Sequence, residues 1–162
     1  MVRSWLVPLL AATLWGGAAA AQPAVTVHNF ARAETDRYLT DLVRMAGIGR
    51  VAHERAVVDV ANQTVIRMNR DTLYSYLVLD LEAGPALVSM PEVGGRFMSL
   101  LAIDQDHYVH GVFYAPARFV FTREQVGTRY MVLLFRTFLD PNTPADVAAA
   151  HAAQDGIRVE QA

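Results

Sequence analysis

The segment from Thr72 to Leu81, TLYSYLVLDL, constrains the fold of this 162-residue chain more than any other part of it. Its residues alternate with a period of two, which is the side-chain period of a β-strand. Four leucines, interrupted by Ser75, share one face, and two tyrosines with Val78 occupy the other. Because both faces are apolar, we expect a strand that is covered on both sides.

Further short strands are expected at 86–90, 96–104, 118–122 and 130–138, separated by turn signals such as Gly94-Gly95. An amphipathic helix is predicted from Phe30, with Asn29 as N-cap and Gly47 as a left-handed C-cap. A second helix is predicted from Pro144 to Gly156, with Thr143 as N-cap and Asp146 in a start resembling a capping box. These elements indicate an α+β fold that is mostly β: an antiparallel β-sandwich or barrel-like sheet with an N-terminal and a C-terminal helix. Residues 48–61 are expected to form loops and short extended pieces, and the tail IRVEQA to remain unanchored.

The first 21 residues have the layout of a secretory signal peptide. One basic residue, Arg3, precedes an apolar run, and small residues lead to a cleavage site after Ala21. A retained membrane anchor is the alternative, but the apolar run is short for a span of about 20 residues. We therefore expect a single β-rich domain at 22–162 that is periplasmic or secreted, with no membrane span after cleavage.

Composition excludes several classes of chemistry. The chain has no cysteine and no lysine, since all fourteen basic residues are arginine. Thiol catalysis, Schiff-base formation and a phosphate-loop lysine are therefore excluded. The formal net charge of −2 gives no indication of a nucleic-acid partner.

The first candidate site is the polar corner directly before the strand at Thr72. Asn69 and Asp71 point to one side of an extended chain, together with Arg67, and Arg70 points to the other. One interpretation is a hydrogen-bonded polar plug in which Asp71 accepts backbone N–H groups at a turn and Asn69 caps another turn. The other is a ligand site in which Arg67 or Arg70 binds an anionic group. If Asp71 is buried and paired, its replacement by alanine is expected to cost about 2–4 kcal/mol.

The second candidate site is the segment IDQDHYVHG. Asp104, Asp106, His107 and His110 could together ligate a divalent metal, although their spacing matches no known zinc signature. The alternative is a solvated loop at the end of a strand. Aromatic residues near His107, among them Tyr108, could line an apolar pocket, and Tyr74 adds aromatic surface to the first site. We expect the two candidate sites to open onto one shared hollow.

Four segments carry a family resemblance: NFARAETDRYL, NQTVIRMNRDTLYS, GGRFMSLLAIDQDHY and VGTRYMVLLFRTFLDPNTPADVAAAHAAQD. The most specific piece is Asn69-x-Asp71-Thr72-x-Tyr74. These segments resemble a bacterial domain-of-unknown-function family, the one numbered twelve fifty-four. The resemblance implies a β-rich sandwich with flanking helices. It also implies that many relatives continue into a second domain, numbered twelve fourteen. Two expectations follow: either a separate protein carries that domain and is a partner of this chain, or this domain works alone.

Three functional hypotheses follow. The main one is a periplasmic accessory module without a recognised catalytic nucleophile, which binds a small-molecule ligand or a partner chain. The corner of Arg67, Asn69, Arg70 and Asp71, with Tyr74 and with the turn of Asp106, His107 and Tyr108, would form its site. The alternative is a metal-assisted envelope hydrolase in which the Asp104–His110 cluster holds the ion and activates water. The third hypothesis is a purely structural envelope protein.

Overall fold

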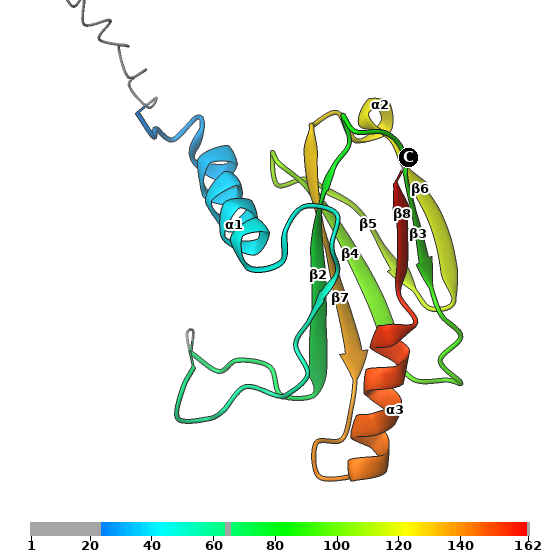
Figure 1. Ribbon diagram of the computed structural model, residues 1–162. Helices are drawn as coiled ribbons and strands as arrows, with labels where there is room; N and C mark the ends of the chain where they lie inside the picture. Colours follow the sequence, from blue (N-terminus) through cyan, green and yellow to red (C-terminus); the bar gives the residue numbers. More distant parts are fainter. Residues whose placement is uncertain (1–23, 64–65, 162) are drawn as a thin grey trace, which may run out of the picture.

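The computed structural model describes residues 24–63 and 66–161 (Figure 1). The predicted signal peptide lies outside these residues. In the described part of the chain, no helix combines the length and the apolarity that are needed to cross a membrane.

Two antiparallel sheets and three helices make up the described chain (Figure 1). The larger sheet has the strand order β1 (Ala52–His53), β2 (Thr72–Asp80), β7 (Tyr130–Phe138), β4 (Met98–Asp104), β5 (Val109–Tyr114). The smaller sheet has the order β6 (Ala117–Phe121), β3 (Ala86–Met90), β8 (Arg158–Gln161). The helices are α1 (Phe30–Ala46), α2 (Arg123–Val126) and α3 (Pro144–Asp155). The predicted class, mostly β with a helix near each end, is confirmed, and the sheets do not close into a barrel.

The main hydrophobic core lies between the two sheets. The leucine face of β2 contributes Leu77 and Leu79, which are almost completely buried with Phe135 of β7 and Val88 of β3. The opposite face of β2 is covered over part of its length by α1, because Val78 packs against Leu39 in a second cluster. The strand that the sequence predicts to be covered on both sides therefore has a sheet on one face and a helix on the other.

Two strands were not predicted from the sequence. β5 follows a tight turn in which Asp104 N–H donates to the carbonyl of Tyr108, and this turn reverses the chain so that β5 pairs with β4. The tail expected to be unanchored forms β8, whose residues pair with β3 from Arg158 to Gln161. The side chain of Gln161 also donates to the carbonyl of Asp80 at 2.7 Å. Both strands are short, and their partners are known only once the sheet is assembled.

The helix ends differ from the predicted caps. Asn29 and Thr143 occupy the N-cap positions, but neither side chain forms the capping hydrogen bond. The Asn29 side chain instead accepts the backbone N–H of Thr26 at 2.6 Å. Gly47 has a φ of 87° but an extended ψ of 162°, so it does not form a left-handed helical cap. Gly156 has right-handed helical angles.

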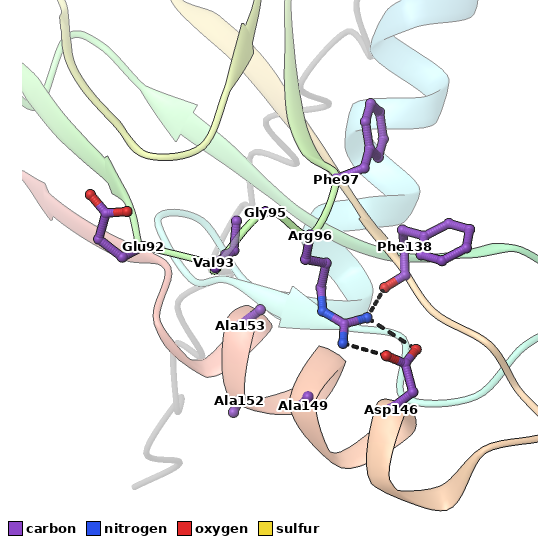
Figure 2. Close-up of a pocket in the computed structure, with 11 residues that line it drawn as sticks. Glu92, Val93, Gly95, Arg96, Phe97, Phe138, Asp146, Ala149, Ala152 and Ala153 are labelled. Atoms are coloured by element: carbon purple, nitrogen blue, oxygen red, sulfur yellow. Dashed lines mark hydrogen bonds and ion pairs between the residues drawn. The ribbon is translucent and has the colours of Figure 1, made fainter.

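Helix α3 is joined to the larger sheet by an ion pair between Arg96 and Asp146 (Figure 2). The Arg96 guanidinium donates to both carboxylate oxygens, at 2.5 and 3.1 Å, and to the carbonyl of Phe138 at 2.6 Å. The Asp146 carboxylate also accepts the backbone N–H of Asp140 at 2.7 Å. The Arg96 guanidinium lowers the pKa of Asp146 to about 2, with the Asp140 N–H as second cause. These groups line an open hollow of about 620 Å³ but bond to one another, so they fix the helix.

We predict that Asp146→Asn lowers stability in a pH-dependent way. The folded pKa of about 2 lies below the ordinary value of 3.8, so the carboxylate stabilises the fold above about pH 4. This contribution is lost as the pH falls from about 4 to 2. Urea unfolding followed by circular dichroism should give a wild-type advantage at pH 6 that shrinks across this window. The matched control is Asp41→Asn. Asp41 forms an exposed ion pair on α1, and the loss of such a pair should change the free energy of unfolding little. An advantage that is constant with pH would contradict the assignment.

We also predict that Thr137→Val stabilises the protein by about 1 kcal/mol. Thr137 is completely buried, and its hydroxyl has no hydrogen-bond partner within the described residues. Valine removes this unpaired group at nearly the same shape. The matched control is Thr35→Val, since the buried Thr35 hydroxyl donates to the Ala31 carbonyl at 2.8 Å, and its loss should cost about 1 kcal/mol. If chemical denaturation shows the same loss of stability for Thr137→Val as for Thr35→Val, the Thr137 hydroxyl has a hydrogen-bond partner and the prediction is wrong.

Candidate functional site

The hollow on the outer face of the larger sheet, beside α1, is the candidate site. It measures about 830 Å³ and is bounded by α1, by residues 54–63 and 66–69, and by β2 and β7. Figure 1 shows residues 54–63 as a loop that leaves the sheet below α1, and residues 66–71 as the stretch that leads to the start of β2. The lining is largely apolar and aromatic: Tyr38, Leu42, Ala56, Val57, Val58, Met68, Leu73, Tyr74 and Tyr76. Its polar members are Glu54, Asn62, Arg67, Asn69, Thr72 and Arg136.

Tyr74 and Arg136 form the polar part of the floor. They are direct partners across the β2–β7 register, so they stand side by side on the outer face. Nε and Nη2 of Arg136 donate to the Tyr74 hydroxyl at 3.1 and 2.6 Å. The guanidinium carbon also lies 5.1 Å from the centroid of the tyrosine ring. The two side chains therefore act as one unit.

Tyr76, two residues along the same face, forms a second polar contact. Its hydroxyl donates to Oε1 of Glu54 at 3.3 Å. Burial raises the pKa of Tyr76, and the charge of Glu54 raises it further. The hydroxyl therefore stays protonated at neutral pH and serves as a donor.

A buried hydrogen-bonded joint of Gln154, Ser75 and His53 lies behind the hollow and fixes the backbone of β1 and β2. Gln154 of α3 is completely buried, and its amide donates to the carbonyls of Glu54 and Tyr74 and to the hydroxyl of Ser75. Nδ1 of His53 lies 2.8 Å from the same hydroxyl. Burial lowers the pKa of His53, and the charge of Arg55 adds to this effect. Sequence reasoning missed the joint, because its members come from three distant segments and carry no common motif.

The polar corner is a turn at the rim of the hollow. Oδ1 of Asn69 accepts the backbone N–H of Asp71 at 3.1 Å, and its amide donates to the Thr72 hydroxyl. Arg70 is exposed and donates to the carbonyl of Val58 at 2.9 Å. The Asp71 carboxylate is exposed and forms no hydrogen bond or ion pair with the described residues. The interpretation in which Asp71 accepts N–H groups is wrong, because Asn69 is the acceptor. Of the predicted residues, Arg67, Asn69 and Tyr74 line the hollow, and Arg70 and Asp71 do not.

The Asp104–His110 segment is a turn that docks α1. Asp104 is buried, accepts two backbone N–H groups of the turn, and lies 2.9 Å from Nε2 of His110. Asp106 pairs with Arg32 of α1 at 2.7 Å. Nδ1 of His107 lies 2.9 Å from the Thr35 hydroxyl.

The structure does not assemble the predicted metal site. Asp104 and His110 contact each other, whereas Asp106 pairs with Arg32 and His107 contacts Thr35, so the four side chains do not converge on one point. Within residues 24–63 and 66–161, no group of three His, Asp or Glu side chains could hold a metal ion. Tyr108 is 72% exposed and lines none of the hollows described here.

The expected shared hollow is also wrong. Along β7, Thr72 lies opposite Phe138, whereas Asp104 lies opposite Met131. The polar corner and the acidic turn therefore occupy opposite ends of the larger sheet. The sequence order allowed no prediction of this, because β2 and β4 both pair with the long strand β7, which comes later in the chain.

The fold and the hollow define a mostly β, two-sheet protein with a largely apolar hollow on the outer face of its larger sheet. The family model of proteins of unknown function, DUF1254, matches residues 48–161, and the chain belongs to this family.

A crystal structure with a similar fold is that of the VPA0106 protein from Vibrio parahaemolyticus, with a TM-score of 0.64 and 18% sequence identity. The match covers 81% of this chain and 35% of the Vibrio chain. The chain thus spans about a third of the length of that protein, and the similarity shows the fold alone. A comparison with curated proteins gives no match.

The polar corner yields a paired prediction. Asn69→Ala removes a bond to the Asp71 N–H and one to Thr72, and should cost about 1–2 kcal/mol in urea unfolding. Asp71→Ala should change stability by less than about 0.5 kcal/mol, because the carboxylate is exposed. A larger loss for Asp71 than for Asn69 would contradict this geometry and restore the buried, paired aspartate expected from the sequence.

Proposed function

We propose that this protein is a binding module that holds a small apolar or aromatic molecule in the hollow between α1 and the larger sheet. The observation that supports the proposal is the hollow itself, with its volume of about 830 Å³ and its tyrosine, leucine, valine and methionine lining. Ligand sites are typically concave, mostly apolar, and about 300–1,000 Å³ in volume. A few polar groups, here Tyr74 with Arg136 and Tyr76 with Glu54, would orient the ligand.

The chemistry of the lining favours binding over catalysis. Among the described residues that line the hollow there is no serine, cysteine or histidine. The nearby pair of His53 and Ser75 resembles a base and a nucleophile, but Ser75 is completely buried and also bonded to Gln154. The third hypothesis, a purely structural role, leaves an apolar hollow of this size without a purpose.

We propose further that the protein acts in the periplasm or outside the cell. The support is the sequence of residues 1–21, with its basic start, apolar run and small-residue end. Expression of the full chain in a Gram-negative host, followed by mass spectrometry of the periplasmic fraction, tests the proposal. The expected product begins at Gln22, and an intact product in the membrane fraction would contradict it.

A partner polypeptide is a second candidate, favoured by an exposed apolar area that begins at Phe138, the strand partner of Thr72 in the lining of the hollow. Phe97, Val112, Tyr114 and Phe138 are all exposed, and the rings of Phe97 and Tyr114 lie 5.9 Å apart. This area would receive a separate protein carrying the family's second domain. In co-expression with such a protein, Tyr114→Glu with Phe138→Glu should abolish co-elution, and unchanged co-elution would contradict this surface.

The binding proposal predicts uptake of N-phenyl-1-naphthylamine, an uncharged aromatic probe whose fluorescence rises in apolar sites. Wild-type protein should bind one probe per chain, and Tyr38→Ala should weaken binding at least threefold, because this ring forms one wall of the hollow. The matched control is Tyr108→Ala, since Tyr108 is 72% exposed and Tyr38 55%, and Tyr108 lies outside the hollow. No saturable binding, or equal loss in both variants, would contradict the proposal.

A further inference from the structure

We propose that the ligand is an organic anion whose negative group contacts Tyr74 and Arg136, while its apolar body lies along the aromatic wall. This inference rests on the proposed function and adds the class of ligand. It starts from the hydrogen-bonding capacity that the two side chains leave unused.

Arg136 keeps an unneutralised charge at the hollow. Its guanidinium carries five N–H donors, and the contacts from Nε and Nη2 both go to one oxygen, that of Tyr74. Arg136 forms no ion pair within the described residues. In contrast, six other arginines have a carboxylate within ion-pair distance: Arg32, Arg37, Arg44, Arg55, Arg96 and Arg129.

The Tyr74 hydroxyl has a free donor. Its oxygen accepts the two Arg136 N–H groups, and its own proton has no acceptor within the described part of the chain. A hydroxyl that accepts from a cation is a strengthened donor, because hydrogen bonds polarise one another. The remaining N–H groups of Arg136 and the O–H of Tyr74 are therefore available to one anionic group.

The charges around the hollow also favour a ligand whose anionic group lies at Tyr74 and Arg136. Arg67 is a second cation in the lining, and Glu54 is the single carboxylate among the described lining residues. Glu54 accepts from Tyr76, not from Arg136. A ligand anion is thus attracted by Tyr74 and Arg136 and repelled by Glu54.

The hollow beside α3 shows a contrasting arrangement. Its arginine, Arg96, already donates to the Asp146 carboxylate and to the Phe138 carbonyl, so few of its N–H groups remain for a ligand (Figure 2). Both hollows contain an arginine, but the guanidinium of Arg136, unlike that of Arg96, has no carboxylate partner among the described residues and keeps N–H groups free for a ligand.

The test compares two probes that differ by one group. 1-Anilinonaphthalene-8-sulfonate carries the same aromatic body as N-phenyl-1-naphthylamine plus a sulfonate. Wild-type protein should bind the sulfonate at least tenfold more tightly than the neutral probe. Arg136→Gln should remove this preference, because it should weaken binding of the sulfonate at least tenfold more than binding of the neutral probe. Tyr74→Phe should weaken binding of the sulfonate probe about threefold.

The control for a general charge effect is Arg118→Gln, since Arg118 is exposed on β6 of the other sheet and forms no ion pair within the described residues. It should leave both affinities unchanged, and circular dichroism confirms that each variant folds. If the neutral probe binds but the sulfonate has no advantage, or if Arg136→Gln and Arg118→Gln act alike, the anion inference is overturned and the binding function stands. If neither probe binds at one site per chain, the proposed function itself fails.

Discussion

The pairing of β2 with β7 is the interaction on which the rest of the structure depends. Nine residues of each strand pair in an unbroken register, with Leu77 opposite Leu133 on the core face and Tyr74 opposite Arg136 on the outer face. A slip of one residue would turn every side chain to the other side of the sheet. The leucines of β2 could then not reach the core between the sheets, and the tyrosine and the arginine would not meet. The hydrophobic core and the polar floor of the hollow therefore depend on the same register.

The fold was predictable where the pattern is local and long. The alternation in β2 and the helical spacing of Phe30–Ala46 each identify an element without any knowledge of its partner. β5 and β8 could not be identified this way, since each is short and defined by the strand beside which it lies. The same limit applies to the helix caps: Thr143 stands at the predicted position, but its hydroxyl donates to Asp140.

The candidate site was predictable in part. The sequence identified Asn69, Arg67 and Tyr74, because polar residues beside a buried strand must either pair or face a cavity. It did not identify Arg136, which lies 62 residues beyond Tyr74 in a strand without any distinctive motif. The acidic turn shows the opposite error. Carboxylates and imidazoles that are close in sequence suggest a metal, yet the buried Asp104 satisfies backbone N–H groups, and Asp106 and His107 hold α1 against the sheet.

The alternation of β7 also bears on how such proteins can diversify. Met131, Leu133 and Phe135 face inward and are completely buried, whereas Arg136 is exposed at the hollow. Neighbouring positions of one strand thus carry separate duties, and a mutation at Arg136 leaves the core between the sheets intact. A lineage with this scaffold can therefore change the side chains that line its hollow by small steps, without passing through an unfolded ancestor.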